Sequence, residues 1–221
     1  MLELHRRIQN EVRIGATRSV GIYILPDVIS SITTDFPNLK ISLLTQGRSL
    51  TYERLQQGAL DLAIVLADTV PRGFFAKRLR SESLCFVISP KHPLASKRVI
   101  SKEDLKKVPF IFGVKGNDFS DMIDEVLEKN GLPTPTRGIT INDLRVRKEA
   151  VRAGVGVTVL PAFTVREEVQ NKTLKVFAIE GARLPDTRLK IIEAQRRSLN
   201  ANVEAVKRAL QQKLALGNRH R

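Results

Sequence analysis

Short polar turns that carry arginine, lysine and small hydroxyl or amide side chains are the residues of this sequence best suited to chemistry. They are Thr17, Arg18 and Ser19; Gly47, Arg48 and Ser49; Asp68; Lys115, Gly116 and Asn117; and Asn142. Several of these turns follow an apolar segment and precede a helical one, where free backbone N–H groups favour an anion. Three of them add a formal positive charge. We therefore predict a site for a small carboxylate or similar anion; the alternative is that these side chains only cap helices.

Residue patterns typical of catalysis or metal binding are not found in the sequence. His5, His92 and His220 have no partner at the spacing of metal ligands, and Cys85 lies in an apolar segment that predicts a buried strand. There is no G-x-S-x-G, H-E-x-x-H or G-x-x-x-x-G-K-[ST] motif. The glycines at Gly154–Gly156 lack the third glycine of a dinucleotide fingerprint and precede their strand. We expect no cofactor, no metal and no enzymatic activity.

An alternation of apolar strands and amphipathic helices occupies the first third of the chain. It predicts a strand over 12–16, a helix over 22–36, a strand over 40–45, a helix over 50–57 and a strand over 60–66. Pro26 conflicts with the first helix unless it lies in the first turn or kinks the helix. Such a run predicts parallel strands with right-handed crossovers, whose carboxyl ends lie at one edge of the sheet.

A second alternation begins near Phe110. It predicts a strand over 110–114, a helix that ends before Gly131, a strand over 138–141, a helix capped by Asn142 or Asp143, and a buried strand that ends at Pro161. Further strands are expected over 84–89, 174–179 and 189–194, and a capping box at Ser101–Asp104. The stripe of a terminal amphipathic helix is Leu199, Val203, Val206, Leu210 and Leu214.

The order of these segments predicts an α/β fold of two Rossmann-like lobes. Because the chain returns near its end to the first type of element, we assign residues 11–88 and 190–216 to one lobe and 89–189 to the other, joined by two crossing strands. A cleft between lobes of this kind usually holds a small ligand. Sensing or carrying is therefore favoured over catalysis.

The net charge of +14 raises the question of nucleic acid binding. Segments 72–107 and 183–221 each hold ten basic and three acidic residues, and the remainder of the chain balances. With two tyrosines and no tryptophan, the sequence offers few aromatic side chains for base stacking. The charge pattern favours a solvated basic surface over direct nucleic acid binding.

The sequence also indicates the cellular compartment in which the protein acts. No apolar run approaches the roughly 18 to 20 residues of a membrane span, and residues 1–10 lack the hydrophobic region of a secretory signal. A single cysteine excludes an internal disulfide. We expect a cytoplasmic protein with no membrane partner.

Four segments, taken in order, resemble one family. They are Arg13–Pro26, Glu53–Ile64, Pro90–Leu94 and Ala150–Pro161, and the likeness spans roughly Glu11 to Leu210. The chain resembles the effector-binding domain of LysR-type transcriptional regulators, which has the two-lobed fold of type II periplasmic binding proteins. The resemblance implies an inducer in the cleft, contacted by Thr17–Ser19, Arg48, Ser49, Lys115–Asn117, Asn142 and Pro161.

The same resemblance implies partners. Family members pair side by side as homodimers, which would place the first helix, 22–36, in the contact. A tetramer is a further expectation for the full-length protein. Members also carry an N-terminal winged helix-turn-helix joined by a long linker helix, and residues 1–10 would be the tail of that linker. DNA would then be bound only through a domain that this sequence does not include.

Two other classes of function fit the same fold. One is a stand-alone solute-binding protein, which would carry a signal peptide upstream. The other is an enzyme related to deaminases or dehydratases, which would need a general acid or base in the cleft, where the polar turns offer only Asp68 and Lys115. A ligand-sensing, dimerising regulatory domain is the leading hypothesis.

Overall fold

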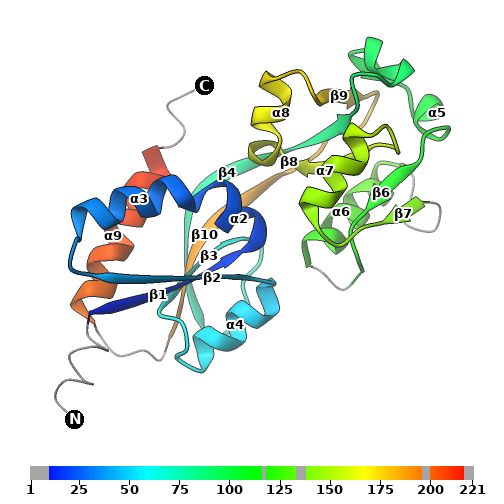
Figure 1. Ribbon diagram of the computed structural model, residues 1–221. Coiled ribbons are helices and arrows are strands. Elements are labelled where there is room, and N and C mark those ends of the chain that lie inside the picture. Colours follow the sequence, from blue (N-terminus) through cyan, green and yellow to red (C-terminus); the bar gives the residue numbers. More distant parts are fainter. Residues whose placement is uncertain (1–9, 116–117, 133–137, 196–199, 217–221) are drawn as a thin grey trace. The chain divides into compact units, whose positions relative to one another are not determined.

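The computed structural model describes residues 10–115, 118–132, 138–195 and 200–216, which form two compact units (Figure 1). Unit 1 comprises Met1–Ser81 and Arg188–Arg221, and unit 2 comprises Glu82–Thr187. The chain passes between the units inside two strands, β4 (Phe74–Ile88) and β10 (Asp186–Ala194). The lobe boundaries expected from the sequence, after residues 88 and 189, lie a few residues further along these strands. The predicted tail of a linker helix, residues 1–10, lies almost wholly outside the described residues.

Unit 1 is built on a sheet whose first three strands are parallel. Strand β1 (Glu11–Thr17) pairs with β2 (Lys40–Gln46) on one side and with β3 (Leu62–Leu66) on the other. The order continues with β10, antiparallel to β3, and then β4. The predicted parallel pairing is confirmed, so the carboxyl ends of β1, β2 and β3 lie at one edge.

The described part of unit 1 contains four helices: α2 (Arg18–Tyr23), α3 (Leu25–Asp35), α4 (Arg48–Gln56) and α9 (Ala201–Leu216). Most of the helix predicted over 22–36 is found as α3, but its start is wrong, because Ile24 ends α2 and is the N-cap of α3. Pro26 lies in the first turn of α3, where its missing N–H removes no helical hydrogen bond.

The core of unit 1 is formed by the strands and by helix stripes. The apolar face of α4 contributes Tyr52 and Leu55, which pack with Ala63, Val65 and Phe74 of the strands. The predicted stripe of α9 is confirmed for its four described members, all buried, whereas Leu199 lies outside the described residues. None of the described helices is long and apolar enough to span a membrane.

A charged clamp joins the start of β1 to the turn before β3. Asp61 Oδ2 accepts hydrogen bonds from the backbone N (2.7 Å) and the Nε (3.1 Å) of Arg13, and Oδ1 accepts from Nη2 at 2.8 Å. The Asp61 backbone N donates in return to the Arg13 carbonyl at 2.9 Å. The hydrogen bonding that the Arg13 side chain donates to Asp61 is also the main reason that the pKa of Arg13 is raised. The clamp fixes the register of β1 against β3 at the amino end of both strands.

Unit 2 holds a mixed set of short strands. Strands β8 (Thr158–Pro161) and β9 (Lys175–Ile179) pair antiparallel with β4, and β9 pairs in parallel with β5 (Val99–Ile100). Strand β6 (Phe110–Phe112) pairs in parallel with β7 (Gly138–Thr140). Strand β4 begins ten residues before the strand predicted at Leu84. The prediction missed this first part because it is largely exposed and has no apolar run.

The helices of unit 2 are α5 (Lys102–Leu105), α6 (Asp118–Lys129), α7 (Leu144–Arg152) and α8 (Arg166–Gln170), with short 3₁₀ turns at Pro93–Ser96 and Ala162–Thr164. Ser101 caps α5 as predicted, with its Oγ accepting from the Asp104 N at 3.1 Å. Asp143, not Asn142, caps α7 by accepting from the N atoms of Arg145 and Val146. The apolar sides of α6 and the strands meet in a core that includes Phe86, Phe110 and Leu127.

We predict that Asp61→Asn destabilises the protein by about 2 kcal/mol, because it removes a charge-assisted, bidentate contact with the Arg13 side chain. Urea unfolding followed by circular dichroism measures the change. The matched control is Asp186→Asn, which removes an exposed carboxylate from the start of β10. Equal stabilities of the two variants would contradict a structural role for the clamp.

Candidate functional site

The carboxyl ends of β1 and β2 form the centre of the candidate site in unit 1. Thr17 and Gln46 are paired in register, and helices α2 and α4 begin directly after them. The residues at the two N-cap positions, Thr17 and Gly47, make no side-chain cap to their helices. Because an uncapped helix start leaves backbone N–H groups available, this edge is suited to an acceptor-rich ligand.

Arg48 lies across this edge. Its Nη1 donates a hydrogen bond to the Leu66 carbonyl at the end of β3, at 3.2 Å. Burial lowers the pKa of Arg48, while Tyr52 and Asp68 nearby act in the opposite direction. The guanidinium is thus a half-buried cation held over the ends of the parallel strands.

Asp68 is surrounded by cations from β10. Its Oδ1 pairs with Arg188 Nη1 at 2.9 Å, and its carbonyl accepts from Lys190 Nζ at 2.6 Å. Burial lowers the pKa of Lys190, and the neighbouring charges of Arg188 and Arg48 lower it further against the effect of Asp68. Three cations therefore interact with one carboxylate, which leaves an excess of positive charge at this edge.

Three buried polar atoms on β1, β2 and α4 have no hydrogen-bond partner among the described residues. They are Thr17 Oγ1, Gln46 Nε2 and Tyr52 Oη. The first two lie on paired residues, and Tyr52 is close enough to Arg48 for their charges to interact. A buried donor without a partner is unfavourable, so a bound molecule with acceptor atoms would stabilise all three.

The remaining predicted residues of unit 1 take part less directly. Arg18 and Ser49 lie in the first turns of α2 and α4, where both are exposed, and Ser19 is half-buried. No interaction within the described part of the chain joins Arg18 to the group around Asp68. Thr17, Arg48 and Asp68 thus lie at the edge as the sequence argument expected, and the role of Arg18 stays a prediction.

The predicted residues of unit 2 come from three strand ends. Lys115 follows β6 and is exposed, Asn142 follows β7 and is exposed, and Pro161 ends β8 and is buried opposite Leu84. Gly116 and Asn117 lie outside the described residues. Because β6 and β8 run in parallel at Phe110 and Val157, the turn after β6 and Pro161 lie toward the same end of the unit.

Arg147, which the sequence argument missed, is the most unusual polar residue at this end of unit 2. Its side chain is buried, with the residue 5% exposed, and its Nε has no hydrogen-bond partner. Burial lowers the pKa of Arg147, opposed by Asp143 and Asp124. A Cβ placed on Gly113, directly after β6, would lie 3.4 Å from the guanidinium, so Arg147 reaches the carboxyl end of that strand.

Weak signals for the missed residues were present in the sequence. Arg188 and Lys190 alternate with apolar residues in a predicted strand, and the register Leu189 to Leu66 brings both beside Asp68. That register could not be read without knowing that β10 lies beside β3. Arg147 lies four residues after the helix cap Asp143, and the structure places it on the buried side of α7. A sequence pattern predicts that a charged residue in a helix is exposed, so its burial could not be read from the sequence.

The arrangement is suited to binding an anion, because its charged groups are mostly cations. No cluster of three or more metal-ligating side chains occurs in the described parts of the chain. The buried Cys85 has an inert thiol: its Sγ contacts the Leu160 carbonyl at 3.5 Å, and burial raises its pKa to about 12. What each unit offers separately is a set of hydrogen-bond donors with positive charge.

Comparison with known proteins gives a consistent picture. The family model described as the LysR substrate binding domain matches residues 5–215. The HTH-type transcriptional regulator CysL of Bacillus subtilis is 26% identical over 177 residues, which cover 80% of this chain and 59% of CysL. This chain therefore spans about three fifths of the length of that relative.

Solved structures share the fold. The regulatory domain of CcmR from Synechocystis PCC6803, in complex with 2-PG, matches with a TM-score of 0.79 at 18% identity, covering 95% of this chain and 98% of that domain. The effector binding domain of BenM with its effector benzoate matches with a TM-score of 0.75 at 22% identity, covering 94% and 93%. At these identities the likeness establishes the two-lobed α/β fold.

We predict that the Cys85 thiol reacts with Ellman's reagent at pH 8 on the order of 10³-fold more slowly in the folded protein than in urea, because a pKa of about 12 leaves almost no thiolate. Following the absorbance of the released thionitrobenzoate gives both rates. A folded-state rate within tenfold of the unfolded one would contradict the buried, inert thiol.

Proposed function

Because this chain belongs to the family of LysR substrate-binding domains, which are regulatory and not enzymatic, we propose that it binds a small anionic effector and controls transcription through a DNA-binding domain of the same protein. The binding of the effector would change the relative populations of two arrangements of the units. Such a switch requires that the effector bind one arrangement more tightly than the other.

The observation that carries this proposal is the excess of donors at the edge of unit 1. Arg48, Arg188 and Lys190 all interact with the residue Asp68, and three buried polar atoms on β1, β2 and α4 have no partner among the described residues. The most direct way to satisfy such a group is a ligand that brings negative charge and several acceptor atoms. Benzoate, the effector of BenM, is a carboxylate and supports this ligand class by analogy.

The residues that we assign to the effector come from both units. In unit 1 they are Thr17, Arg18, Ser19, Gly47, Arg48, Ser49 and Asp68, to which we add Gln46, Tyr52 and Lys190. In unit 2 they are Lys115, Gly116, Asn117, Asn142 and Pro161, to which we add Arg147. The assignment of one ligand to both groups rests on the family, in which the effector binds between the lobes.

The partners and compartment follow from the same family membership. We propose that the domain forms a homodimer, that it contacts DNA only through another domain of the full protein, and that the protein acts in the cytoplasm. For the dimer contact, α3 and the neighbouring edge strand β2 are the best candidates, because a sheet edge has unpaired backbone groups that another chain can cover.

We predict that at least one of acetate, succinate, benzoate and phosphate stabilises the protein in a thermal shift assay, and that Arg48→Met weakens its binding at least tenfold in calorimetry. Loss of a charge-assisted hydrogen bond in a half-buried site has this magnitude.

The matched control is Arg208→Met, which removes an exposed arginine from α9 in the same unit. The proposal fails if a ligand that stabilises the wild type binds equally well to the Arg48 variant. It fails also if Arg208→Met weakens binding as much, since the effect would then come from net charge alone.

We expect the domain to be a dimer at tens of micromolar in sedimentation velocity, and Ile22→Glu to shift it toward monomer, because a charge at the end of α2 would disrupt an apolar contact beside α3. Val169→Glu, at a residue of equal exposure on α8 in unit 2, serves as the control. A monomeric wild type, or equal effects of the two substitutions, would count against this contact.

A further inference from the structure

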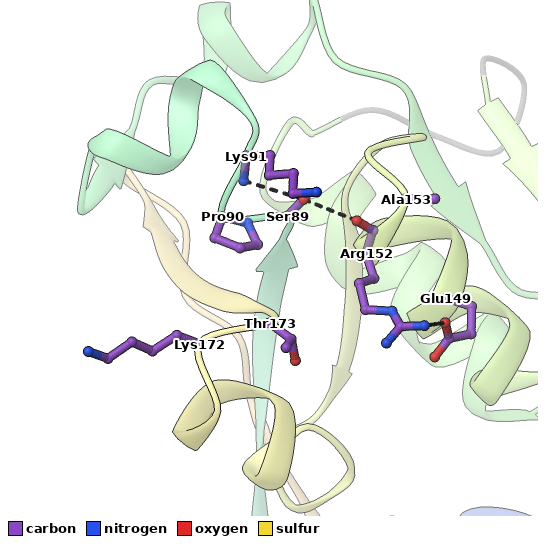
Figure 2. A pocket seen from close by; sticks show the side chains of 8 residues that line it. All are labelled: Ser89, Pro90, Lys91, Glu149, Arg152, Ala153, Lys172 and Thr173. Carbon is purple, nitrogen blue, oxygen red and sulfur yellow. Dashed lines mark hydrogen bonds and ion pairs between the residues drawn. The ribbon is translucent and has the colours of Figure 1, made fainter.

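Unit 2 contains a surface cavity of about 490 Å³ that the proposed effector site does not include (Figure 2). It lies where three elements end: β4 at Ser89 and Pro90, α7 at Arg152, and the turn after α8 at Lys172 and Thr173. All of its walls belong to unit 2. The cavity is therefore a feature of this unit alone.

The cavity carries an excess of positive charge. Lys91, Arg152 and Lys172 line it together with one carboxylate, Glu149, which is already paired with Arg152. Within the described ranges, the ammonium groups of Lys91 and Lys172 have no ion-pair or hydrogen-bond partner. Two lysines on separate elements are thus available to a ligand, and neither is neutralised by the protein.

The wall beneath Lys91 is held by a buried hydroxyl. Ser89 is 1% exposed, its Oγ donates to the Arg152 carbonyl at 3.2 Å, and it accepts from the Lys91 N at 3.4 Å. Figure 2 shows Lys91 extending over Ser89, with the Arg152 and Glu149 pair on the adjoining wall. The end of β4 is therefore tied to the end of α7, which fixes the spacing of the cations that these elements carry.

Lys172 occupies a backbone conformation that is unfavourable for its residue type. Its φ is 57°, and it is the sole non-glycine residue with positive φ in the part of the chain that is described. The position follows the C-cap Asn171 of α8, where glycine is the usual residue. At the equivalent place after α7, the chain does have glycine, Gly154. The lysine is therefore kept against its backbone preference, and its charge complements the carboxyl end of α8 and is also available to a ligand.

The cavity lies at the opposite end of unit 2 from the proposed effector residues. In the antiparallel pairing of β4 with β8, Leu84 is opposite Pro161, and the strand then runs five residues to Ser89. At about 3.3 Å per residue, this separates the cavity from Pro161 by about 16 Å. One small effector could not contact both places.

We propose that this cavity binds a second ligand, a small anion with more than one phosphate-type charge, independently of the effector. Ammonium and guanidinium donors on three elements match the dispersed charge of such an anion. None of the described residues that line the cavity is aromatic, so they offer a nucleobase no stacking surface. A concave site of this size admits a small molecule more readily than the backbone of a DNA duplex.

Inorganic pyrophosphate is the probe, titrated by calorimetry at 150 mM KCl into wild type and three variants. Lys91→Gln/Lys172→Gln removes the two unpaired cations of the cavity. Lys106→Gln/Lys129→Gln removes the same charge from exposed positions elsewhere on unit 2. Arg48→Met removes the central cation of the effector site. We expect saturable binding that weakens at least tenfold in the cavity variant and is unchanged in the other two.

Three results would overturn the proposal: no saturable binding by the wild type, equal weakening in the Lys106/Lys129 control, or loss in Arg48→Met with retention in the cavity variant. The last would mean that pyrophosphate occupies the effector site, and it would leave the proposed function standing. A cavity variant that is less stable without ligand, yet binds pyrophosphate as wild type does, would show that the lysines only complement the carboxyl end of α7. If a short DNA duplex protected Lys91 and Lys172 from chemical modification and pyrophosphate did not, the cavity would be part of a nucleic acid surface instead.

Discussion

The parallel pairing of β1 with both of its neighbours is the constraint on which unit 1 depends. Because β1 lies between β2 and β3 in register, the ends of all three strands, and the starts of two helices, come to the same edge. The Arg13 and Asp61 clamp fixes this register at the far end of the strands. A shift of one residue would turn Thr17 away from Gln46 and bury charges in place of the apolar core.

Burial and charge act together at that edge. A cation taken partly out of water is destabilised, which is the direction in which the pKa values of Arg48 and Lys190 move. Neighbouring cations add to the cost for Lys190, and Asp68 compensates only in part. In unit 2 the same physics applies to Arg147, whose guanidinium is more deeply buried. A site that holds cations in this way is less stable when it is empty than when an anion fills it. The buried cations therefore contribute more to ligand binding than to the stability of the empty domain.

The sequence was most informative where side-chain periodicity reports on burial. Strands β1, β2 and β3, helix α9 and the caps Ser101 and Asp143 follow from local patterns. The first part of β4 could not be predicted, because a strand that is largely exposed carries no alternating apolar signal. The same distinction holds for the site residues. Thr17 and Arg48 could be predicted, because they follow the ends of strands that local patterns identify. Lys190 could not, because its place depends on the long-range register of β10 against β3, and Arg147 could not, because local patterns treat a charged residue as exposed.

The crossing of the chain inside β4 and β10 has a consequence for synthesis on the ribosome. Unit 2 is one continuous segment, Glu82–Thr187, so it can fold as soon as that segment emerges. Unit 1 is interrupted by it, and its sheet lacks β10 while its α3 lacks α9 until residues 186–216 are made. The exposed flank of β3 must therefore stay unpaired during the translation of more than 100 residues. Arg188 and Lys190 arrive with β10, so the cationic edge is completed only after the whole of unit 2 has been translated.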